Sequence, residues 1–289
     1  MLRRTFILGA GLGSFAGSGA AAADLILEQR AHRGKRWTAW QVSMDTHPLR
    51  LCWGGQDGRP LRDFKRLEAY LGSQGKKLVL AMNAGMFEQD GSPVGWCVAE
   101  GKTIKGANEQ EGAGNFFLKP NGVFAMEDGK AAVLETSVAM KRLKRPTLVT
   151  QSGPLLVMGG KIHPAFNENS VNRKIRNAVG VTPEGAVWFA ISEDEVSFHE
   201  SATFFRDDLG CPDALFLDGV VSRMYAPGLG RKGGAALLGP LLAVAVPTCG
   251  HGKTGMGGSG LCSRGWKPRG VTGWKPVGRT GWKPVLRGG

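Results

Sequence analysis

The stretch Leu78-Val79-Leu80-Ala81-Met82-Asn83-Ala84-Gly85-Met86-Phe87 joins an apolar run directly to a polar turn. An unbroken apolar run of this length is typical of a strand that is buried on both faces. Such a strand delivers Asn83 at its terminus, and Gly85 permits a close backbone approach or a positive φ angle just beyond it. We therefore expect this junction to combine the core of the fold with a polar site.

Two further apolar strands end in the same way. Residues 147–150 lead into Gln151-Ser152-Gly153-Pro154, and residues 214–217 lead into Asp218-Gly219. Any one of these ends taken alone is best interpreted as a turn, because Asn, Asp, Ser and Gly all favour turns. Three of them together favour a shared cleft, because ligand sites gather where strand ends meet.

The rest of the chain is patterned mainly as short strands joined by turns. A helix is expected at 61–71, where four apolar residues fall on one face, and a second at 198–209, which Gly210 ends. The expected strands and apolar segments are 37–42, 77–82, 116–119, 123–126, 131–135, 155–158, 161–162, 178–182, 186–191, 214–217 and 237–246. This order predicts an α+β fold, a single domain with a mixed, largely antiparallel β-sheet core and a few helices.

Charged residues near the strand ends are candidate site groups. Arg176 closes a cationic loop at 172–176 and stands directly before a strand, where its planar fork suits a phosphate or carboxylate. Glu200 lies at the start of the second expected helix, where an acidic residue also suits the helix dipole. Residues 193–195 form an acidic cluster that fits a surface turn or a calcium-tolerant loop.

The two ends of the chain differ in composition from the middle. Residues 1–23 have the order of a signal peptide, with Arg3-Arg4 before an apolar run and small residues before Asp24. The two arginines fit a twin-arginine signal and an ordinary secretory signal equally well. Residues 249–289 repeat Gly-Trp-Lys-Pro and lack apolar periodicity, which predicts a disordered basic tail. We therefore expect one folded domain at 24–248 in a periplasmic or secreted protein with no stable membrane span.

The net charge belongs mostly to those ends. The chain has a formal charge of +13, of which the tail supplies eight cations and the leader two, so residues 24–248 carry +3. A folded part so close to neutral argues against a nucleic acid partner. The five cysteines show no zinc-like spacing, and HExxH and GxSxG motifs are absent from the sequence. We expect no cofactor and no catalytic metal, while a structural divalent cation such as calcium stays open.

Four motifs in order resemble the phosphodiester glycosidase family, which includes the uncovering enzyme, N-acetylglucosamine-1-phosphodiester α-N-acetylglucosaminidase. The resemblance spans residues 37–245. The motifs are Asn83-Ala84-Gly85-Met86-Phe87, Gln151-Ser152-Gly153-Pro154, Arg176-Asn177-Ala178-Val179-Gly180, and Leu217-Asp218-Gly219 with Ser222 and Met224-Tyr225. The family's usual Asp-Gly-Gly-Gly-Ser-Ser run is here Asp218-Gly219-Val220-Val221-Ser222-Arg223, which indicates a different pocket wall.

The resemblance implies hydrolysis of a sugar-1-phosphodiester at the glycosidic carbon, with release of a sugar and a phosphomonoester. We assign candidate catalytic roles by residue type: Asp218 or Glu200 activates water or stabilises an oxocarbenium-like centre, and Arg176 stabilises the leaving phosphate. Asn83 is a further catalytic candidate that holds sugar hydroxyls or phosphate oxygens. The candidate substrate-binding residues are Gly85, Ser152, Gly153 and Ser222.

Two other function classes remain open from the sequence. A noncatalytic module that binds envelope glycan in the same cleft is the first, and the altered run after Asp218 favours it. A phosphodiesterase that cuts the P–O bond is the second, and it normally needs metal ligands that the sequence does not assemble. In each case the expected partner is a small or polymer-linked sugar phosphodiester or a glycan.

Overall fold

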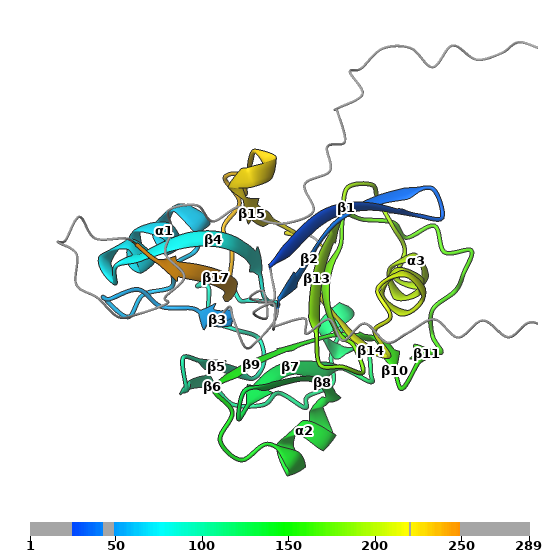
Figure 1. The fold of residues 1–289 in the computed structure, drawn as a ribbon. Helices are drawn as coiled ribbons and strands as arrows, with labels where there is room; N and C mark the ends of the chain where they lie inside the picture. Colours follow the sequence, from blue (N-terminus) through cyan, green and yellow to red (C-terminus); the bar gives the residue numbers. More distant parts are fainter. Residues whose placement is uncertain (1–24, 43–48, 220, 249–289) are drawn as a thin grey trace, which may run out of the picture.

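The computed structural model describes residues 25–42, 49–219 and 221–248. The expected leader at 1–23 and the expected tail at 249–289 lie outside the described residues. Three sheets make up the described part of the chain (Figure 1). In spatial order, the seven-stranded sheet contains β1 (Ile26–His32), β2 (Lys35–Val42), β13 (Val187–Ser192), β12 (Asn177–Val181), β14 (Asp213–Asp218), β10 (Leu155–Met158) and β11 (Lys161–Ile162).

Two five-stranded sheets pack against the first. One contains β16 (Arg231–Lys232), β15 (Met224–Ala226), β4 (Lys76–Asn83), β17 (Leu241–Pro247) and β3 (Leu49–Cys52). The other contains β6 (Lys102–Lys105), β5 (Cys97–Ala99), β9 (Leu148–Ser152), β7 (Gly122–Glu127) and β8 (Lys130–Glu135). Every strand pair within the described ranges is antiparallel. The predicted α+β class with a largely antiparallel core is confirmed.

Short helices pack on the faces of the sheets. Asp63 caps α1 (Phe64–Ser73) by accepting a hydrogen bond from the Arg66 N–H at 2.7 Å, which is why this helix begins three residues later than its apolar pattern suggested. The other two are α2 (Thr136–Arg142) and α3 (Phe198–Thr203). No helix in the described ranges is both long and apolar enough to cross a membrane.

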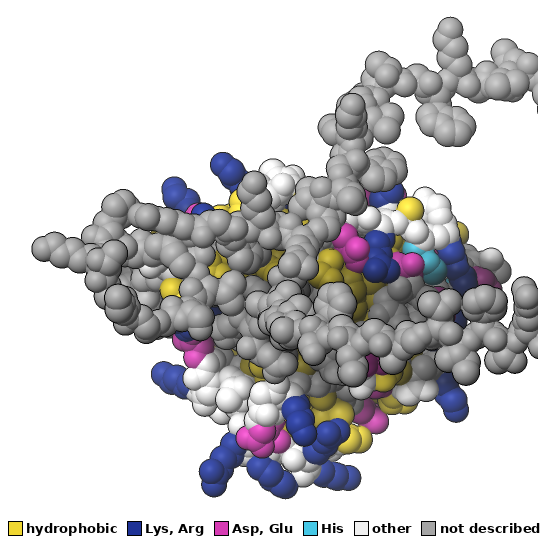
Figure 2. Space-filling view, in the orientation of Figure 1, with side chains coloured by type: hydrophobic (Ala, Val, Ile, Leu, Met, Phe, Trp, Pro, Cys, Tyr) yellow, Lys and Arg dark blue, Asp and Glu magenta, His cyan; other side chains and the backbone are white. Residues whose placement is uncertain are grey.

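The end of α2 carries a group of surface cations. Lys141 and Arg142 occupy the last turn of the helix, and Lys144 and Arg145 follow it, all exposed. Figure 2 shows Lys and Arg side chains gathered over this lower end of the molecule. Cations at a helix C-terminus interact favourably with the helix dipole, so two of these charges stabilise α2.

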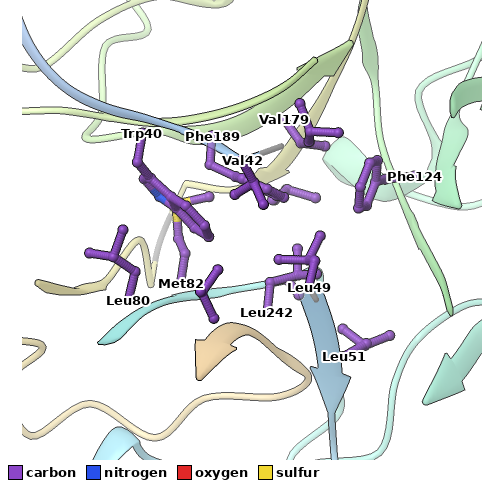
Figure 3. Close-up of a cluster of buried hydrophobic side chains, with 14 of the residues drawn as sticks. Trp40, Val42, Leu49, Leu51, Leu80, Met82, Phe124, Val179, Phe189 and Leu242 are labelled. Carbon is purple, nitrogen blue, oxygen red and sulfur yellow. The ribbon is translucent and has the colours of Figure 1, made fainter. Parts of the chain in front are cut away.

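The main core lies between the three sheets. Figure 3 shows Trp40 and Val42 of β2 facing Leu80 and Met82 of β4, with Phe189 of β13 beside them. The rings of Trp40 and Phe189 stack with centroids 4.3 Å apart. Full burial of one large apolar side chain stabilises the fold by about 1.5–3 kcal/mol. The predicted burial of β4 on both faces is confirmed, because every residue from Leu78 to Asn83 is buried.

The structure differs from the expected elements in several segments. Residues 116–119, expected as a strand, contain instead the end of a 3-10 turn, η1 (Asn115–Phe117), which starts after Gly114 at φ 96°, and the bend that follows it. The helix expected at 198–209 begins at the right residue, but its second half is a π-helical turn, η2 (Phe204–Asp208), before Gly210 at φ 66° ends it. β1, β3 and α2 carried too little apolar periodicity to be recognised.

Candidate active site

Three strand ends from two sheets meet at a buried asparagine pair. Asn83 ends β4, Asn177 begins β12, and Asp218 ends β14. The Asn177 Nδ2 donates to both the backbone oxygen and the Oδ1 of Asn83, each at 2.9 Å, and the Asp218 N–H donates to Asn177 Oδ1 at 2.9 Å. Asn177 therefore joins the seven-stranded sheet to the sheet of β4.

The strand pairing beside the site is irregular. Asn177 pairs with Asp218, but the next residue, Ala178, pairs with Phe216, so Leu217 has no opposite residue. A bulge of this kind changes the direction of the following side chain and is common next to functional sites. Here it brings Asp218 to the same level as Asn177 and Asn83.

Both oxygens of the Asp218 carboxylate accept hydrogen bonds from the surrounding chain. Asn83 Nδ2 donates to Oδ2 at 3.4 Å, and the Val221 N–H donates to Oδ1 at 3.2 Å. The residue is only 6 % exposed. A carboxylate held from both sides in this way has a fixed orientation, as general base or electrostatic catalysis requires.

A cavity of about 490 Å³ opens beside Asp218 and is large enough for a small ligand. Its wall is mainly apolar, and Glu88 and Asp218 are the charged residues among its described lining. The apolar lining residues are Met86, Phe87, Val94, Ala113, Phe116, Phe117 and Val221, and Gly114, Asn115 and Gly219 complete the wall. The cavity thus places two carboxylates and several aromatic rings around one space.

Ser152 and its neighbours brace the site from the third sheet. The Ser152 Oγ donates to the Leu217 backbone oxygen at 2.8 Å, and the Thr150 Oγ1 donates to the Ala84 backbone oxygen. A Cβ at Gly153 would lie 2.6 Å from the Phe116 oxygen, and one at Gly85 would lie 2.9 Å from Thr150 Oγ1. These residues hold strand ends close together, and none of the three predicted binding residues Gly85, Ser152 and Gly153 lines the cavity.

Ser222 lies in the turn after β14. Its Oγ donates to the Asp218 backbone oxygen at 2.6 Å and lies 3.3 Å from Asn177 Oδ1. The side chain is 2 % exposed. Its geometry fixes the turn that follows the candidate catalytic carboxylate, and its predicted role in substrate binding stays a prediction.

Arg176 lies under the site rather than in its wall. Its Nε donates to the Val196 oxygen at 2.9 Å, and its guanidinium stacks 3.8 Å above the centre of the Phe198 ring. Burial lowers the pKa of this guanidinium to about 10. A Cβ at Gly219 would lie 3.2 Å from Arg176 Nη1, so one corner of the fork lies beside Gly219 in the cavity wall.

Glu200 does not join the other candidates. Its carboxylate accepts a hydrogen bond from the Ser197 N–H at 2.7 Å, which completes a capping box at the start of α3, and it pairs with Arg173 at 3.2 Å. Burial alone raises the pKa of Glu200, but the hydrogen bonds from Ser197 and Arg173 outweigh it and hold the pKa below its ordinary value. Glu200 is absent from the described lining of the Asp218 cavity. Its catalytic role stays a prediction, and its geometry fits a helix cap.

Sequence reasoning did not single out two residues that the structure places at the site. Asn177 lies next to Arg176 in one of the family motifs. It directly precedes the strand expected at 178–182, and this position at a strand end is the sequence signal that could have identified it as a site residue. Glu88 follows the Met86-Phe87 pair and carries the second carboxylate of the cavity. No group of three or more His, Cys, Asp or Glu side chains within the described ranges is arranged to hold a metal ion.

Comparison with known proteins identifies the class of domain. The family model described as phosphodiester glycosidase matches residues 76–241, which is more than half of the chain, and the chain belongs to this family. That assignment supports a glycosidase-type hydrolase in general.

Individual proteins are similar to this chain in sequence or in fold. The chain is 32% identical over 197 residues to the uncharacterized protein YigE of Escherichia coli (strain K12), covering 68% of this chain and 75% of that protein. The zebrafish N-acetylglucosamine-1-phosphodiester α-N-acetylglucosaminidase catalytic domain, auto-inhibited by its pro-peptide, has the same fold with a TM-score of 0.53 at 14% identity, covering 79% of this chain and 85% of that one. A hypothetical protein from Synechocystis matches with a TM-score of 0.51 at 16% identity, covering 77% and 62%.

Proposed function

We propose that this protein is an exported hydrolase that cleaves the glycosidic bond of a sugar-1-phosphodiester and releases a sugar and a phosphomonoester. The observation that carries the proposal is the Asp218 carboxylate, which is held by Asn83 and Val221 at the wall of a cavity large enough for a sugar. The family assignment supports this class of reaction. The leader-like residues 1–23 support export to the periplasm or the medium.

The proposed reaction transfers the sugar to water. The water oxygen bonds to the anomeric carbon, the bond from that carbon to the phosphate oxygen breaks, and its electron pair leaves with the phosphate. A phosphate leaves as a stable anion and needs little protonation, so the main demand is for a group that accepts the water proton or stabilises the positive sugar carbon. Asp218 meets that demand in the proposed mechanism.

Glu88 and Asn83 have supporting roles in this mechanism. Glycosidases commonly use two carboxylates, and Glu88 supplies the second one in the same cavity. Asn83 Nδ2 orients Asp218 from the buried side. Phe87, Phe116 and Phe117 offer apolar faces of the kind on which sugar rings pack. We propose no cofactor for this chemistry.

The experiment compares Asp218→Asn with a matched control in the same strand. Asp213 lies at the other end of β14, where it accepts a hydrogen bond from the Gly159 N–H, so Asp213→Asn makes the same chemical change away from the cavity. Both variants and the parent protein are assayed on a sugar-1-phosphate nitrophenyl diester. Asp218→Asn is expected to lower kcat by at least about 100-fold, the size typical of general acid–base groups, while Asp213→Asn retains turnover.

Hydrolysis in oxygen-18 water identifies the bond that breaks. Label in the released sugar supports glycosidic cleavage, and label in the phosphate would instead indicate a phosphodiesterase. Saturable binding of the same diesters with no turnover by the parent protein would refute the hydrolase proposal and favour the noncatalytic glycan-binding module.

A further inference from the structure

We propose that the turn after Asp218 also borders a second ligand site, in which Arg223 and Arg231 bind a phosphate or carboxylate group. Gly219 and Val221 of this turn line the Asp218 cavity, whereas Ser222 and Arg223 line a separate cavity of about 340 Å³. The two cavities have no described lining residue in common. The second cavity is therefore a distinct space beside the candidate active site.

This second cavity lies between two sheets. β13 and the residues after it contribute Ile191, Ser192 and Glu193, and the opposite wall comes from Arg223, Met224, Arg231 and Gly233 around β15 and β16. Ile191, Ser192 and Met224 are buried, whereas Glu193 and both arginines are partly exposed. The cavity thus has a buried floor and a charged rim.

The charges of the rim leave one cation in excess. Arg231 Nη1 forms an ion pair with Glu193, and it also donates to Thr38 Oγ1 at 3.2 Å, while Thr38 Oγ1 donates to Glu193. Glu193 is therefore neutralised and held in place. Arg223 forms no ion pair with any described residue, and its charge is not balanced within the cavity.

Both guanidinium groups keep donors for a ligand. Arg223 Nη1 donates to the Ser222 backbone oxygen at 2.8 Å, but its Nε and Nη2 have no acceptor among the described residues. Arg231 uses Nη1 in the contacts above, and its Nε and Nη2 likewise have no acceptor in the described ranges. Guanidinium forks match the paired oxygens of phosphate and carboxylate, which is why the inferred ligand is an oxyanion.

The second cavity is joined to the candidate active site through the backbone. The Arg223 N–H donates to Asn83 Oδ1 at 2.9 Å, and Asn83 Nδ2 contacts the Asp218 carboxylate. A bound oxyanion that holds the Arg223 side chain also restrains the turn that positions Asp218. The oxyanion can come from a second part of the substrate or from a free anion, and the first source rests on the proposed function.

The direct test is calorimetric titration of the full chain with inorganic phosphate, and separately with acetate, at low ionic strength. Arg223→Ser keeps the backbone contact to Asn83 and removes the fork, so it is expected to weaken binding of the better ligand by about tenfold or more, as loss of a charged hydrogen-bonding partner does. Arg206→Ser is the matched control, because Arg206 is a partly exposed arginine that pairs with Asp207, away from the lining of either cavity. Arg231→Gln, on the same wall as Arg223, provides a second variant with the same expected loss.

Absence of saturable binding to the parent protein, or equal affinity of the parent and both cavity variants, would overturn the proposal. If the parent protein binds the anion, kinetic measurements separate the two sources of the oxyanion. If added phosphate raises KM in the parent but not in Arg223→Ser, the second cavity binds a group of the substrate. If added phosphate changes kcat at constant KM, the second cavity binds a free anion. The titration does not depend on turnover, so failure of the hydrolase proposal and failure of this one give different results.

Discussion

Replacing Asn177 by alanine removes the side chain that joins two sheets at the candidate active site. Asn177 is fully buried and takes part in hydrogen bonds with Asn83, Asp218 and Ser222. In Asn177→Ala the Asp218 N–H loses its acceptor, and the Asn83 backbone oxygen loses a donor. Asn83 Oδ1 keeps the Arg223 N–H as a partner.

The magnitude follows from those losses. A buried donor left without a partner costs about 1–3 kcal/mol, and the space left by the truncated side chain adds to this. We expect Asn177→Ala to lower the free energy of unfolding by about 2–4 kcal/mol. For a domain of this size that corresponds to a fall in Tm of roughly 5–15 °C.

The assay is urea unfolding followed by tryptophan fluorescence, with buried Trp37 and Trp40 among the reporters. Asn169→Ala is the control, because Asn169 is exposed. Asn177→Asp is the informative second variant, because it keeps the shape of the side chain but sets a carboxylate against two oxygens of Asn83. At neutral pH it should lower stability more than alanine does. Stability should recover on acidification, because a protonated carboxyl can donate a hydrogen bond. A loss below about 0.5 kcal/mol in Asn177→Ala would refute the reasoning, because it would mean that Asn177 does not join the sheets.

Two further variants test the surroundings of the site. Gly85→Ala combines φ 139° with a Cβ only 2.9 Å from Thr150 Oγ1, so thermal unfolding should show a loss of stability of about 1–3 kcal/mol. The loss should be larger than in the control Gly101→Ala, where φ is 78° and no atom lies within 4 Å of the added Cβ. Equal losses in the two variants would contradict the steric part of this account. Glu200→Gln tests the helix cap: because the folded-state pKa of Glu200 lies below its ordinary value, its charge stabilises the fold above the unfolded-state pKa of about 4.3, and this contribution is lost as pH falls through the folded-state value. The stability difference between parent and variant should therefore shrink on acidification. A constant difference from neutral to strongly acidic pH would contradict the role of the Glu200 charge in the helix cap. Loss of turnover at unchanged stability would support the catalytic prediction for Glu200.

The sequence predicted the elements whose signals are local. β4 was recognisable because Leu78 to Met82 form an unbroken apolar run, and the hairpin of β7 and β8 because its turn carries Asp128 and Gly129, both with positive φ. Edge strands such as β1, in which Leu27 is the one buried residue, leave a weak pattern. Their positions depend on the strands that they pair with.

The candidate site was predictable in outline and not in detail. The sequence predicted that Asn83 and Asp218 come together, because each follows an apolar strand and is close to a glycine. The division of roles did not follow, because it depends on which atoms a side chain meets across the fold. Arg176 looks like an anion-binding residue in sequence, yet stacking on Phe198 and burial make it part of the support beneath the cavity. Loss of activity in Arg176→Ala would therefore also report loss of that support.

The position of β17 sets the order in which the molecule can become complete. β17 is the last strand of the described chain, and it inserts between β3 and β4, where Leu241 pairs with Asn83 and the Pro240 oxygen accepts the Ala84 N–H. The end of β4 therefore lacks part of its hydrogen bonding until residues near 240 have been synthesised. Contacts between such distant parts of a chain form slowly. A growing polypeptide that ends before β17 lacks the pairing that holds Asn83 in place. The site can therefore form only after nearly the whole domain has been synthesised.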